Sequence, residues 1–113
     1  MDESFRQREK SYEAKFKLDE ERRFKAESRR NKLLGLWAAE KMGLPQTERD
    51  AYALSVINAD FKEPGHDDVI RKIKKDFDAR SIKIGTDEIR EELTRLYGIA
   101  LEQISKEYPQ PLG

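Results

Sequence analysis

The chain of 113 residues has no cysteine, a single histidine and no apolar run longer than residues 33–39, LLGLWAA. Without cysteine, disulfides and thiolate metal sites are excluded. Because a membrane-spanning helix needs about 18 apolar residues or more, and no apolar core of a secretion signal is visible, we predict no membrane insertion and a cytoplasmic location.

The sequence also lacks the groupings typical of catalytic sites. His66 stands beside Asp67 and Asp68, but neighbours on a helix point in different directions and no second histidine can complete a metal site. We therefore interpret His66 as the solvated start of a helix. No Gly-rich loop with a following Lys and Ser/Thr is present to hold a phosphate. The prediction is a protein that is not an enzyme and has no metal or cofactor.

The charge balance is uneven along the chain. Residues 1–32 hold 11 Lys/Arg and 8 Asp/Glu, a net charge of +3, whereas residues 33–113 hold 12 and 15, a net charge of −3. Interspersed acids argue against a nucleic-acid-binding arm, which needs a basic stripe. With 41% charged residues over the whole chain, we expect one small domain and an N-terminal segment that does not pack into it.

Residues 1–18 have good helix formers and little apolar surface beyond three aromatic residues. On a helix, Phe5, Tyr12 and Phe16 fall within roughly 40° of one another. Such a helix is marginal alone but can fold on docking in a partner's groove. A frayed extension, or a stripe that packs on the protein's own bundle, remains an alternative.

Four helices are predicted from apolar periodicity. The first spans about residues 19–42, with a solvated front up to Lys32 and a buried rear from Leu33 that places Trp37 in the core. Gly43 and Pro45 end it. Gly35 and Gly98 lie within helices, where glycine costs about 1 kcal/mol relative to alanine, so close helix crossings, one against the other, would explain them.

The other three helices follow after short connectors. The second has Thr47 as its cap, with Asp50 completing a capping box, and runs to about Lys62; the fourth is capped by Thr86. An extended connector is expected near residues 82–84. The inward-facing residues are Leu54, Ile57 and Phe61 on the second helix, Val69, Ile70, Ile73 and Phe77 on the third, and Ile89, Leu93, Leu96, Tyr97, Ala100 and Ile104 on the fourth.

Short connectors favour antiparallel neighbours, so the prediction is an all-α, four-helix up-and-down bundle. A mobile, charged N-terminal arm is expected to continue into the long first helix. The expected divisions are a flexible segment over 1–19, the bundle over 20–108 and a tail over 109–113.

The stretch 15–44, KFKLDEERRFKAESRRNKLLGLWAAEKMGL, resembles the zeta subunit of bacterial F-type ATP synthases, a small inhibitor of ATP hydrolysis. The most specific segments are FKA at 24–26, RRNKLLGLWAA at 29–39 and GL at 43–44. Further similarity runs through Tyr52, residues 60–65, and Asp67, Val69, Ile70, Lys72 and Ile73, so the resemblance covers nearly the whole chain.

The resemblance implies that the N-terminal segment, about 1–19, is mobile when free and becomes helical when wedged at a catalytic α/β interface against the central rotor. It implies a protein peripheral to the inner membrane, which we expect to be monomeric when free. In this interpretation Phe5, Tyr12, Phe16 and Phe24 enter apolar pockets, and Arg6, Arg8, Lys10, Lys15 and Lys17 pair with surrounding acids.

Two alternatives remain open. The chain could be a helical adaptor that binds another protein through the same arm without inhibiting it. A coiled-coil homodimer through the charged half of the first helix is the other, although residues 20–32 lack an a/d heptad pattern.

Overall fold

The computed structural model describes residues 2–60 and 65–107, with side chains from residue 19 onward. Its helices are α1 (Asp2–Lys41), α2 (Gln46–Ala59), α3 (Asp67–Ala79) and α4 (Thr86–Glu107). No strand occurs among the described residues, which confirms the predicted all-α fold. The expected end of the second helix near Lys62, its inward Phe61 and the tail 109–113 lie outside the described residues.

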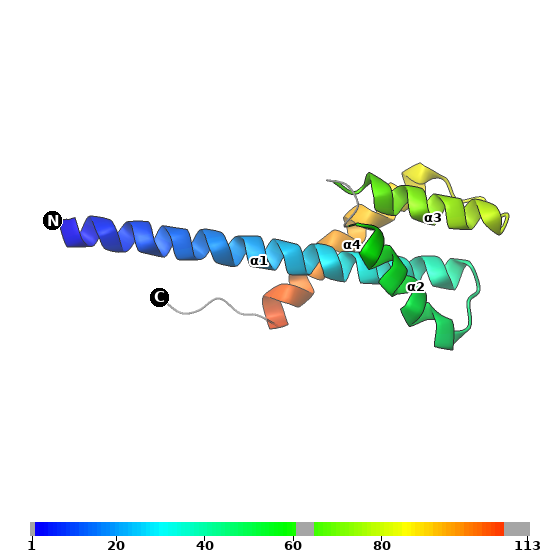
Figure 1. Ribbon diagram of the computed structural model, residues 1–113, viewed down its shortest axis with the longest axis horizontal. Helices are drawn as coiled ribbons and strands as arrows, with labels where there is room; N and C mark the ends of the chain where they lie inside the picture. The colour runs from blue at the N-terminus through cyan, green and yellow to red at the C-terminus, as the bar shows by residue number, and fades with distance from the viewer. Residues whose placement is uncertain (1, 61–64, 108–113) are drawn as a thin grey trace.

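The four helices alternate in direction, as in an up-and-down bundle (Figure 1). The rear half of α1 packs mainly against α2 and α4, and α3 lies across those two helices. The front half of α1 extends away from the other helices, so the molecule measures 67 Å along its longest axis and 26 Å and 20 Å across.

The main core lies between the rear of α1 and the other three helices. Trp37 contacts Phe77 edge to face, with ring centroids 5.8 Å apart and ring planes at 68°. Trp37 therefore packs against the core, as predicted, but is itself only partly buried. The buried members of this cluster are Leu34, Ala38, Val56, Val69, Ile70, Ile73, Phe77, Ile89, Leu93 and Leu96.

A glycine allows α1 and α2 to cross closely. A Cβ added at Gly35 would lie 2.6 Å from the Cα of Ala53, so one predicted close crossing exists, but its partner is α2. A Cβ at Gly98 would meet nothing within 4 Å, and the pairing of the two glycines is wrong. The close approach turns small residues of α2 toward α1, leaving Leu54 56% exposed instead of inward.

Two of the three predicted helix ends need correction. Gly43 has φ of +68°, and the N–H groups of Gly43 and Leu44 donate to the carbonyls of Glu40 and Ala39, as a glycine-terminated helix requires. The capping box at Thr47 is wrong, because α2 begins at Gln46, with Pro45 as the N-cap two residues before Thr47 and no side-chain cap bond. Thr86 is already helical, and the carbonyl before it accepts the N–H of Ile89.

Candidate functional site

The predicted inhibitory arm is the front of α1. Its backbone is helical from Asp2 and continues without a break into the packed half of the helix. The side chains before residue 19 lie outside the described part of the chain, so eight assignments stay predictions. These are Phe5, Arg6, Arg8, Lys10, Tyr12, Lys15, Phe16 and Lys17.

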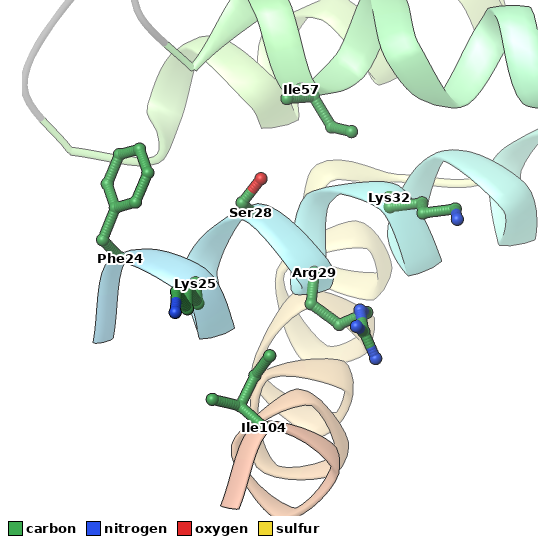
Figure 2. A pocket seen from close by; sticks show the side chains of 7 residues that line it. All are labelled: Phe24, Lys25, Ser28, Arg29, Lys32, Ile57 and Ile104. Atoms are coloured by element: carbon green, nitrogen blue, oxygen red, sulfur yellow. The ribbon is translucent and has the colours of Figure 1, made fainter. Parts of the chain in front are cut away.

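Phe24 is the one predicted partner-binding residue whose side chain the structure describes. It lies on α1 beside the start of the packed region and is 60% exposed (Figure 2). A phenylalanine left this open retains apolar surface that a partner can cover. Its exposure is compatible with the predicted contact role.

The packed part of α1 begins earlier than the sequence predicts. Ala26, Arg30 and Asn31 are 0%, 1% and 2% exposed, so the solvated front extending to Lys32 is wrong. Ala26 packs with Ala100 and Ile104 of α4 in a second, smaller apolar cluster. The last turns of the charged run therefore belong to the bundle, not to the arm.

A buried polar junction holds this end of α1. The Arg30 guanidinium donates to Oδ1 of Asn31 from Nε and Nη2, at 3.1 and 2.9 Å. The Asn31 amide nitrogen in turn donates to Oδ2 of Asp60, at 2.8 Å, at the end of α2. The guanidinium also lies 5.7 Å from the ring centroid of Tyr97 on α4. One pair of adjacent residues thus ties α1 to two other helices.

His66, at the start of α3, is the last member of the junction. It is the N-cap of α3, and its Nδ1 lies 3.0 Å from Nη2 of Arg30. A guanidinium can only donate, so the imidazole nitrogen accepts in this contact. The predicted solvated position for His66 is therefore wrong in part, because the ring is only partly exposed and lies against Arg30.

The junction buries a cation with its counter-charge nearby. Burial lowers the pKa of Arg30, and the carboxylates of Asp60 and Glu27 oppose that shift. Arginine nevertheless stays protonated in proteins, so the junction contains a buried positive charge. The Asp60 carboxylate, 3.6 Å from Nη2, compensates it.

A second, more exposed link joins α1 to the end of α4. The Arg29 guanidinium donates to both carboxylate oxygens of Glu107, at 2.7 and 2.8 Å, and to Gln103 at 2.9 Å. The hydrogen bond from Arg29 lowers the pKa of Glu107. Two consecutive arginines therefore hold the same turn of α1, Arg30 through a buried junction and Arg29 through a pair near solvent.

The sequence contained one signal for this junction. Ala26, Arg30 and Leu34 recur every four residues, which places them on one line of α1. A small residue in an otherwise charged run, aligned with a core leucine, indicates helix contact. Nothing local in the sequence pairs that line with Asp60 or His66.

The described residues contain no group of three His, Cys, Asp or Glu side chains able to hold a metal ion. Within that same part of the chain, no helix is sufficiently long and apolar to cross a membrane.

These features define a small four-helix protein whose first helix projects far beyond its bundle. The family model for ATPase inhibitor subunit zeta matches residues 1–103. The chain therefore belongs to the ATPase inhibitor subunit zeta family, as its resemblance indicated.

One similar solved structure carries the description "Solution NMR structure of the protein". It is 45% identical, has a TM-score of 0.66, and the match covers 74% of this chain and 95% of that one. A comparison with curated proteins finds no match.

Proposed function

We propose that this chain inhibits ATP hydrolysis by the F-type ATP synthase, and that residues 1–19 are its inhibitory element. The segment lodges as a helix at a catalytic α/β interface, against the central rotor, and blocks closure of a catalytic site. The observation that carries the proposal is the family match, which includes this segment as well as the bundle.

The continuity of α1 supports this mechanism. Because the helix runs unbroken from Asp2 into the buried Ala26–Asn31 region, a helical arm is attached directly to a fixed body. Force exerted on the arm by a turning rotor reaches the bundle through the helix backbone. The arm resists rotation in the hydrolysis direction, whereas rotation in the synthesis direction displaces it.

The aromatic stripe supplies the affinity in this proposal. Phe5, Tyr12 and Phe16 enter apolar pockets, Phe24 contacts the rim, and the arm's basic residues pair with acids around the interface. Holding the side chains of the helical arm in place costs about 0.5–1.5 kcal/mol for each immobilised side chain, which the buried contacts offset. The protein acts by binding and not by catalysis, at the cytoplasmic side of the inner membrane.

The deciding experiment is steady-state ATP hydrolysis by the cognate catalytic head, titrated with the full chain and with a chain that starts at Glu20. We expect the full chain to inhibit and the shortened chain to fail. Circular dichroism melting of both chains checks that the bundle is intact. If neither chain inhibits at micromolar excess, the inhibitor proposal fails and a helical adaptor is the better description.

A triple substitution tests the role of the aromatic residues. Replacing Phe5, Tyr12 and Phe16 with alanine removes the proposed anchors, so we expect inhibition to weaken at least about a hundredfold. The melting temperature should stay the same, because the described part of the core is already formed by Ala26 and later residues. A matched triple change of the polar residues Ser4, Gln7 and Ser11 to alanine should keep inhibition. A fall in the melting temperature of the aromatic variant would mean that the stripe packs on the bundle.

A further inference from the structure

A groove runs along α1 at the root of the arm. It has a volume of about 240 Å³ and is open to solvent. Ile57 of α2 and Ile104 of α4 flank it on opposite sides of α1, and Phe24 stands at its arm-side end (Figure 2). It forms where α2 ends, at Ala59, and where α4 runs away from α1 towards its own C-terminal end (Figure 1).

The apolar part of the groove is incompletely covered. Phe24 is 60% exposed, and Ile57 is only partly buried although it faces α1. Apolar side chains scattered singly on a surface are ordinary, but these two line one concave site together with Ile104. The groove can therefore bury an apolar side chain of another molecule.

The charged residues that line the groove are all cationic, although the charge of Arg29 is compensated by Glu107 from outside the lining. Three of its lining residues are cationic, Lys25, Arg29 and Lys32, and none is acidic. Glu107 fixes Arg29 at the α4 side through its two hydrogen bonds, and Lys32 is exposed. A basic rim around an apolar floor is complementary to an amphipathic segment that carries carboxylates.

We infer that this groove is a second docking surface, which receives an acidic amphipathic segment of the same catalytic head that the arm enters. An apolar side chain of that segment packs on Phe24 and Ile57, and its carboxylates face Lys25 and Lys32. This inference rests on the proposed inhibitory function. Phe24 follows Phe16 by eight residues, about 12 Å along the helix, so a single partner surface spans both sites.

Two groups of full-length variants test the surface by the rate constants for binding to the cognate catalytic head. In K25E/K32E the charges of the rim are reversed, and F24A removes the exposed ring. The matched controls are K75E/K83E, which makes the same charge change on exposed lysines outside the groove, and L101A, which truncates another exposed apolar residue.

We expect K25E/K32E to lower the association rate constant about tenfold and to weaken its dependence on salt. We expect F24A to raise the dissociation rate constant about tenfold. Both controls should bind within about twofold of the wild type, and melting temperatures of all variants should agree, because the replaced side chains are outside the core.

The inference is overturned if the wild type inhibits hydrolysis while either groove variant binds like its control. Failure of the proposed function gives a different result, in which the wild type itself neither binds nor inhibits the head. An equal loss of binding in K75E/K83E and K25E/K32E would indicate general electrostatic attraction, and would also overturn a specific groove.

Discussion

The two ends of the packed part of α1 are buried by different kinds of contact, apolar at one end and hydrogen-bonded at the other. At the C-terminal end, next to the turn at Gly43, Leu34, Ala38 and Trp37 lie in an apolar cluster around Phe77. At the arm-side end, Arg30 and Asn31 are equally inaccessible but meet hydrogen-bonding partners from other helices. Apolar contact is non-directional, whereas hydrogen bonds require particular angles. We therefore expect the first end to supply most of the stability and the second to fix the direction in which the arm leaves the bundle.

The largest effect is expected at the apolar end. Phe77→Ala removes a side chain that is 0% exposed and contacts Trp37, so it leaves a cavity in the main core. Such truncations cost about 3–5 kcal/mol in the free energy of unfolding. Urea denaturation followed by Trp37 fluorescence measures this loss. A cost below about 1 kcal/mol would mean that the core is loosely packed and that the contrast between the two ends is misplaced.

The next largest loss of stability is expected at Arg30 and not at the adjacent Arg29. Arg30→Ala leaves Asp60 and Asn31 without their buried partner, and we expect a loss of about 3 kcal/mol. Arg29→Ala is the matched control, because it breaks an exposed pair with Glu107 and should leave the unfolding midpoint nearly unchanged. Equal losses in the two variants, measured by urea denaturation, would contradict a special role for the buried junction.

A smaller effect is expected within the apolar end, at the α1–α2 crossing. Gly35→Ala places a methyl group 2.6 Å from the Cα of Ala53, so the helices must separate, at a cost of about 1–3 kcal/mol. Gly98→Ala is the control, because its methyl group meets open space and should stabilise α4 by up to about 1 kcal/mol. Thermal melting of both variants should therefore shift in opposite directions. Equal shifts would show that backbone propensity alone decides both positions.

The helix pattern and the apolar end of α1 could be predicted because they depend on local periodicity. Leu93, Leu96 and Ile104 face the core as their spacing indicates. On α2 the prediction is wrong for Leu54, because large residues were given more weight than small ones, whereas Ile57 is partly buried and faces α1. Where a glycine brings two helices together, alanines occupy the interface, and residue size ceases to indicate burial.

The polar junction could not be predicted because its members are far apart in the chain. Arg30 and Asp60 are separated by thirty residues, and each has ordinary charged neighbours that suggest solvent. Their pairing depends on where α2 ends and α3 begins relative to α1, which is a tertiary property. For the arm, by contrast, the aromatic spacing predicts a stripe, and its role depends on a partner that this chain does not contain.

Because α1 is one helix from Asp2 to Lys41, the distance and the angular phase between the tip and the bundle are coupled. Each inserted residue would advance the tip by about 1.5 Å and turn it by about 100°, as on a screw thread. Losing seven residues would shorten the projection by about 10 Å yet turn it by only about 20° relative to the original facing. Changes of seven or eleven residues in the length of this helix would therefore nearly keep the face that the arm presents relative to the bundle, whereas a change of one residue would turn that face aside.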